Sequence, residues 1–113
     1  MADSVFEAAV QETLKEIGAA IAAIETLVDV EKQAEVLRDR LVRLLAMARR
    51  DPGIEAAADD LHRAAGAFID AQRRGASGNN PARARALHDA LRRLEERATS
   101  ARPNDRAREL GLD

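Results

Sequence analysis

The longest apolar pattern of this chain lies in residues 5–50, which read VFEAAVQETLKEIGAAIAAIETLVDVEKQAEVLRDRLVRLLAMARR. Large apolar side chains (Val, Ile, Leu, Met and Phe) number 18 in residues 1–50 and 9 in residues 51–113. In the quoted stretch they recur every three or four residues, which is the spacing of one face of an α-helix. This stripe comprises Phe6, Val10, Leu14, Ile17, Ile21, Ile24, Leu27, Val30, Ala34, Leu37, Leu41, Leu44 and Ala48. The pattern predicts a long N-terminal helix over about residues 5–49.

One irregularity interrupts this spacing, because Ile24, Leu27 and Val30 follow one another at two successive intervals of three. Two short steps in a row are a stammer, which overwinds a heptad pattern locally. The β-branched residue Thr26 lies at the same place, and Asp29 is a residue type that caps helix N-termini. We expect a continuous helix here. A kink, or a short break capped by Asp29, is the alternative.

Two shorter helices are expected after the turn signal DPG at residues 51–53. The first covers about residues 54–74, has a stripe made mostly of Ala, and ends at Gly75. The second covers about residues 81–99 behind the capping pair Asn80 and Pro81. Short connections fold successive helices back antiparallel. The expected fold class is therefore all-α, a helical hairpin or coiled-coil bundle forming one domain over residues 1–101, with a C-terminal tail at 102–113.

Composition narrows the class of protein further. The chain has no Cys, which removes disulfides and thiolate sites, and its formal net charge is −2. An acid at Asp3 stands where a signal peptide carries positive charge. The longest uncharged stretch inside the first expected helix has eight residues, 17–24, whereas a membrane span needs about 20. We expect a cytoplasmic protein with no membrane segment.

No catalytic or cofactor motif stands out in the chain. Asp59 and His62 have the i, i+3 spacing of half a di-iron motif, but that motif needs a second copy and two further acids. His88 has Arg85 at the corresponding position, and a guanidinium repels a metal ion. A phosphate-binding loop is also missing from the sequence. We therefore expect no enzyme activity, no cofactor and no metal site.

The surplus of apolar residues in the first half predicts self-association. A long first helix exceeds the length that two shorter helices cover, so part of its stripe would be exposed in a single chain. The expected homo-oligomer interface comprises Phe6, Val10, Leu14, Ile17, Ile21, Ile24 and Val28. The leading hypothesis is a non-enzymatic assembly or adaptor protein that presents its third helix and its tail outward. In the tail, Leu110 and Leu112 are expected to dock into another protein.

Nucleic-acid binding is the first alternative. Residues 1–60 hold 13 acids and 7 bases, and residues 61–113 hold 7 acids and 11 bases. Arg side chains at helical spacing are suited to phosphate contacts, and the candidates are Arg83, Arg85, Arg92 and Arg93. Aromatic residues for base stacking are scarce, so only weak, non-specific binding is expected.

A long-helix hairpin, a basic region and a terminal tail together resemble the layout of small terminase subunits of viral-type DNA packaging machines. The resemblance implies assembly into rings and DNA handling through a terminal segment. No sequence motif accompanies it, and no N-terminal helix-turn-helix is evident.

The second alternative is a small regulator that sequesters a helical partner.

Overall fold

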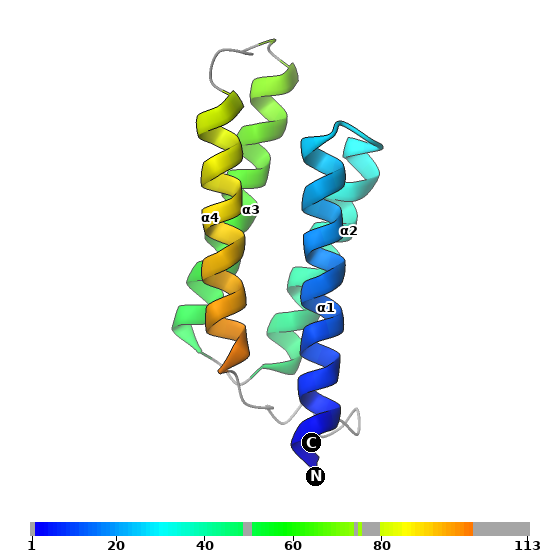
Figure 1. The fold of residues 1–113 in the computed structure, drawn as a ribbon, viewed down its shortest axis with the longest axis vertical. Helices are drawn as coiled ribbons and strands as arrows, with labels where there is room; N and C mark the ends of the chain where they lie inside the picture. Colours follow the sequence, from blue (N-terminus) through cyan, green and yellow to red (C-terminus); the bar gives the residue numbers. More distant parts are fainter. Residues whose placement is uncertain (1, 49–50, 74, 76–79, 101–113) are drawn as a thin grey trace.

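The computed structural model describes residues 2–48, 51–73, 75 and 80–100. It contains four α-helices and no strand within these residues: α1 (Ala2–Glu25), α2 (Val30–Met47), α3 (Pro52–Arg73) and α4 (Asn80–Thr99). Successive helices run antiparallel and form two hairpins, α1–α2 and α3–α4, that lie against each other (Figure 1). The packing within each hairpin is more extensive than the packing between the hairpins. The expected all-α bundle is confirmed.

The continuous helix expected over residues 5–49 is wrong, because the chain turns back between Glu25 and Val30. The amide of Leu27 donates to the carbonyl of Ile24 at 3.1 Å, and the amide of Val28 donates to the carbonyl of Ala23 at 2.9 Å. These two bonds form a Schellman motif, which satisfies the last carbonyls of a helix and ends it. The stammer therefore marks a true helix end.

The residues of this turn adopt conformations that L-amino acids rarely take. Leu27 has a φ of 61° at the position where Gly is usual, and Asp29 has a φ of 47°. Asp29 occupies the N-cap of α2, as the alternative expectation had it, but its side chain makes no capping hydrogen bond. The hydroxyl of Thr26 donates to the carbonyls of Ala22 and Ala23, at 3.0 and 3.2 Å. The two backbone hydrogen bonds thus end α1 although Leu27, and not Gly, occupies the position with a positive φ.

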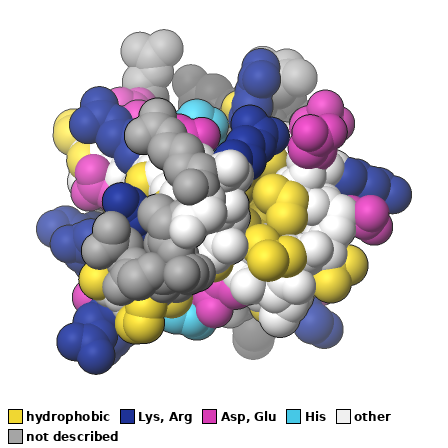
Figure 2. Space-filling model, turned by 90° about the horizontal axis from the view of Figure 1, so that it is seen from above, with side chains coloured by type: hydrophobic (Ala, Val, Ile, Leu, Met, Phe, Trp, Pro, Cys, Tyr) yellow, Lys and Arg dark blue, Asp and Glu magenta, His cyan; other side chains and the backbone are white. Residues whose placement is uncertain are grey.

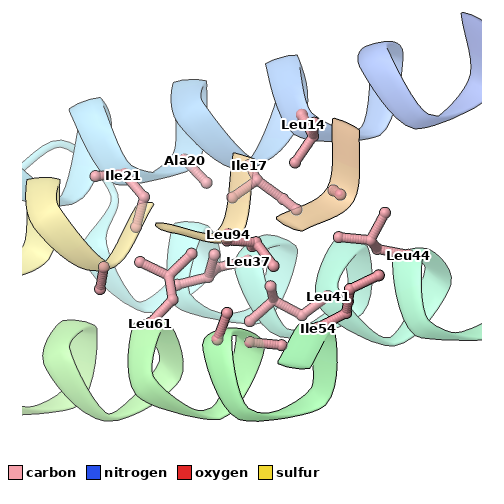
Figure 3. Packing of buried hydrophobic residues seen from close by; sticks show 14 of the residues in the cluster. Leu14, Ile17, Ala20, Ile21, Leu37, Leu41, Leu44, Ile54, Leu61 and Leu94 are labelled. Atoms are coloured by element: carbon pink, nitrogen blue, oxygen red, sulfur yellow. The ribbon is translucent and has the colours of Figure 1, made fainter. Parts of the chain in front are cut away.

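The turn at residues 26–29 brings α2 back along α1, and all four helices bury apolar side chains in one core (Figure 3). Ile17, Ile24, Leu44, Leu61 and Leu94 are wholly buried. The one buried polar side chain among the described residues is Thr13, whose hydroxyl donates to the carbonyl of Ala9 at 2.8 Å. Hydrogen bonding of this kind removes most of the cost of burying a hydroxyl.

The expectation that the first stripe is exposed in a single chain is wrong. Six of its members are at most 7% exposed within this chain's own bundle: Phe6, Val10, Leu14, Ile17, Ile21 and Ile24. The physical reason is the turn at 26–29, because it folds α2 back along α1 as a cover that a continuous helix would have lacked. Val28, the seventh residue of the expected interface, lies in that turn and is 55% exposed.

Among the described residues, three contacts between ionisable side chains join neighbouring helices. Arg40 of α2 pairs with Glu16 of α1, and Arg73 of α3 lies 3.6 Å from Glu31 of α2. His88 Nε2 of α4 lies 2.6 Å from Glu25 Oε1 of α1, so these groups form an ion pair when the imidazole is protonated. Helix α1 carries five acids and one base, whereas α4 carries five Arg and three acids. Neighbouring helices of opposite charge favour this order of the bundle.

Replacing Ile17 by Ala tests whether this side chain belongs to the core of one chain. We expect the free energy of unfolding to fall by about 2–5 kcal/mol, because the change leaves a cavity. Urea unfolding at two protein concentrations measures it, and the loss is expected to be the same at both. Val5→Ala, at an exposed position of α1 outside the hollows described below, is the control, with an expected change below about 0.5 kcal/mol. A loss that depends on protein concentration would place Ile17 between chains instead.

Replacing Leu27 by Gly tests the strain in the first turn. Gly adopts a positive φ without steric cost, so we expect the free energy of unfolding to rise by about 1 kcal/mol. The matched control is Val28→Gly at the equally exposed next position, whose φ is not positive. That change is expected to lower stability by about 0.4–1 kcal/mol, because Gly increases the entropy of the unfolded chain. Equal losses for both variants in urea unfolding would contradict strain at Leu27.

Candidate interaction surface

Helix α2 carries more apolar residues than the core of the bundle covers. Leu41 and Leu44 are buried, whereas the adjacent residues Val42 and Leu45 lie outside the core, exposed and half-buried respectively. Val42 is 61% exposed, more than any other large apolar side chain that the structure describes. Single exposed apolar residues are common on protein surfaces, so the surroundings of Val42 decide whether it has a role.

Those surroundings form an open groove of about 210 Å³ between α2 and α3. Helix α2 lines it with Arg38, Leu41, Val42 and Leu45. Helix α3 lines it with Glu55, Ala58, Asp59 and His62. The floor is apolar, because Leu41 and Ala58 lie there and are 5% and 4% exposed. The rim is polar and charged.

The sequence of α3 explains why this hollow exists. The one apolar residue that α3 contributes to the groove is the small Ala58, so α3 offers no large apolar side chain to cover Val42 and Leu45. Asp51 begins the helix by accepting a hydrogen bond from the Gly53 amide at 2.7 Å, and Pro52 is the first helical residue. This cap determines where α3 starts.

A second hollow, of about 200 Å³, lies between α1 and α4. Its lining consists of Phe6, Glu7, Val10, Gln11, Ala98 and Thr99. Its large apolar side chains, Phe6 and Val10, are 3% and 2% exposed, so they already lie in the core and offer little surface to a partner. The groove between α2 and α3 differs in this respect, since Val42 stands clear of the core.

A third apolar feature lies at the end of the bundle where α1 joins α2. Leu27 and Val28 are 54% and 55% exposed there. Figure 2 looks onto this end and shows hydrophobic side chains at the surface on the side formed by α1 and α2. The feature is an exposed tip formed by two adjacent apolar residues of the turn.

The Arg residues expected to contact nucleic acid do not form a uniformly basic face. Arg85, Arg92 and Arg93 are exposed on α4, whereas Arg83 is half-buried and its Nε is buried without a hydrogen-bond partner that the structure describes. With 3.6 residues per turn, Asp89 and Glu96 lie on the same face as Arg85 and Arg93. Arg92 lies 3.2 Å from Asp89 and pairs with it. Interleaved acids weaken the attraction of this face for phosphate.

The remaining candidates are placed as follows. Asp59 and His62 both line the α2–α3 groove, and Asp59 pairs with Arg63 at 3.0 Å. Among the described residues, no three His, Cys, Asp or Glu side chains gather as a metal ion would require. None of the helices in the described part of the chain combines the length and hydropathy of a membrane span. Leu110 and Leu112 lie outside the described residues.

The groove was not predicted from the sequence. The stripe expected for this region contains Leu37, Leu41 and Leu44 and does not include the pair Val42 and Leu45. Two adjacent apolar pairs, at 41–42 and 44–45, widen the apolar face of α2 beyond a single stripe. A wider apolar face on α2 is the signal in the sequence that indicates apolar surface outside the core.

No protein-family model, curated protein or solved structure matches this chain. The resemblance to small terminase subunits stays a prediction, and one feature on which it rested, the long first helix, is two helices here.

Proposed function

We propose that this protein is a non-catalytic interaction module, an assembly or adaptor protein that binds another polypeptide in the groove between α2 and α3. The observation that carries the proposal is the exposed Val42 beside the half-buried Leu45, above a floor of Leu41 and Ala58. Apolar surface of this kind inside a polar rim is typical of protein interfaces.

The shape and spacing of the groove favour a helical ligand. On α2 the lining residues stand at positions i, i+3, i+4 and i+7, so they cover two helical turns along one line. An amphipathic helix laid along such a groove places its own apolar residues at the same spacing. Arg38 at one end of the α2 side and Glu55 on the α3 side give the two walls opposite charges, which would orient the ligand.

The arrangement of polar groups supports binding more than catalysis. Arg38, Glu55, Asp59 and His62 are exposed side chains on the rim, and the floor between them is apolar. Catalytic groups act most strongly where a site excludes water and aims them at one reacting atom. An open rim of exposed side chains supplies neither condition.

The charged face of α4 supports nucleic-acid binding less well than the α2–α3 groove supports protein binding. Asp89 and Glu96 lie among its exposed Arg residues, and Arg92 is already paired with Asp89. We therefore place the interaction on the α2–α3 groove.

Site-specific photo-crosslinking in the cell that makes the protein tests the proposal. A photoreactive residue replaces Val42 in the full chain, and Asp60 serves as the control, because it is exposed on α3 and does not line the groove. We expect a discrete crosslinked polypeptide from position 42 and none from position 60. No adduct at 42, or the same adducts at both positions, would overturn the proposed function. The mass of the adduct distinguishes a second copy of this chain from another protein.

A further inference from the structure

The tail, residues 102–113, follows the end of α4, and that end lies beside one end of the α2–α3 groove. Helix α2 ends and α3 begins at the same end of the bundle (Figure 1). Arg97, in the last turn of α4, lies against Gly53, where a Cβ atom would come within 3.1 Å of the Arg97 Nη1. Glu55, two residues after Gly53, lines the near end of the groove. The tail therefore starts close to the entrance of the groove.

The tail is also long enough to run along the groove. Its 12 residues span up to about 40 Å when extended. Neighbouring helices lie about 8–10 Å apart, and two helical turns on each wall make the groove about 11 Å long. The path from α4 past the start of α3 and along the groove thus needs about 20 Å, which is roughly half of the extended length.

Charged and apolar residues alternate in the tail in a way that gives an extended chain two different faces. Every second residue of an extended chain faces the same side. One face then carries two bases followed by two large apolar residues, in the order Arg106, Arg108, Leu110 and Leu112. The other face carries the acids Asp105, Glu109 and Asp113. One side of the tail is therefore first basic and then apolar.

The groove has the complementary order when it is followed from the end near α4. Glu55 and Leu45 come first, because they lie near the start of α3 and the end of α2. Val42 follows one helical turn further along, and Arg38 lies at the far end. A tail that enters from α4 brings Arg108 to Glu55 and its leucines to the apolar middle. The opposite direction would bring its arginines to Arg38, which repels them.

The charge at the entrance of the groove is available to the tail. Glu55 is exposed and forms no ion pair with any side chain in the described part of the chain. Asp59, the other acid of the groove, is already paired with Arg63 at 3.0 Å. Glu55 is therefore the carboxylate that a guanidinium of the tail would meet.

We propose that the tail binds in the α2–α3 groove of its own chain, with Leu110 and Leu112 on Val42 and Leu45, and that a protein partner of the groove must displace it. The inference rests on the proposed function and adds the regulation of that site. An extended tail supplies two leucines, whereas an amphipathic helix supplies apolar residues along both turns of the groove. The tail is thus the weaker ligand, and its attachment to α4 compensates by keeping its effective concentration high.

Photo-crosslinking of the purified full chain tests where the tail lies. The photoreactive residue replaces Val42, and trypsin releases residues 109–113 as one peptide, because Arg108 is the last Lys or Arg of the sequence. We expect position 42 to crosslink to this peptide. The yield is expected to stay the same between about 1 and 50 µM protein, since the contact lies within one chain. Position 60, exposed on α3 outside the groove, is the control and is expected to give at least about tenfold less.

Two sets of variants test the contacts. Leu110→Ser with Leu112→Ser is expected to remove the crosslink, whereas Ala107→Ser with Gly111→Ser, on the other face of the tail, is expected to keep it. Glu55→Arg is expected to lower the yield at least about threefold, and adding Arg108→Glu is expected to restore it, with the tail then released as residues 107–113. Asp60→Arg makes the same charge change outside the groove and is expected to have no effect. Circular dichroism establishes that every variant is folded.

The cellular crosslinking experiment at position 42 tests the displacement. With Leu110→Ser and Leu112→Ser the groove is no longer occupied by the tail, so we expect the adduct with the partner protein to increase at least about twofold. An unchanged or weaker adduct would show that the tail does not compete with the partner, and would overturn the proposed regulation.

Three results with the purified chain would overturn the tail contact. They are no crosslink to the tail peptide, equal yields from positions 42 and 60, or a yield that rises with protein concentration, which would assign the tail to a second copy. These results are distinct from failure of the proposed function. If position 42 crosslinks to another protein in the cell but never to the tail, only the tail proposal fails. If it crosslinks to the tail but to no other polypeptide, the proposed function and the displacement fail while the tail contact stands.

Discussion

The fold depends on one turn, the Schellman motif that ends α1 and returns the chain at residues 26–29. Its two backbone hydrogen bonds satisfy carbonyls that a helix end leaves open, and they do so with Leu27 in a left-handed conformation. Without this turn, α1 and α2 would form one rod, and the other two helices are too short to cover it. With the turn, the stripe from Phe6 to Ile24 packs against other helices of the same chain.

The same turn determines what remains uncovered. Once α2 lies on α1, the wide apolar face of α2 must be divided between the core and the seam with α3. Leu41 and Leu44 enter the core, but α3 offers no large apolar side chain in the groove to cover Val42 and Leu45. The apolar surplus of the first half of the sequence is thus real, yet most of it is buried within the chain and only a small part reaches the surface.

Local signals predicted the second half of the chain better than the first. The expected helices at 54–74 and 81–99 correspond to Pro52–Arg73 and Asn80–Thr99, and a Pro lies in the first turn of both, where its fixed φ suits a helix. Asp51 caps α3 and Pro52 is its first residue, whereas the turn signal at 51–53 was expected only to end the preceding helix.

The break at 26–29 was harder to predict because no Gly or Pro marks it. The sequence shows only the stammer and a β-branched residue there, and the choice between a rod and a hairpin depends on tertiary packing. The groove was harder to predict than this break. It results from a wide apolar face on α2 packing beside a helix, α3, that offers no large apolar side chain to cover it. Neither helix predicts the groove by itself.

The unequal packing of the bundle has a consequence for its motions. Each hairpin packs more extensively within itself than against the other, so the contact between the two hairpins is the weaker boundary inside the shared core. Proteins open locally along such boundaries before they unfold as a whole. Amide hydrogens of α1 and α2 would then exchange with solvent as one group, and those of α3 and α4 as another. The α2–α3 groove lies on the seam, so a molecule bound there would slow the exchange of both groups at once.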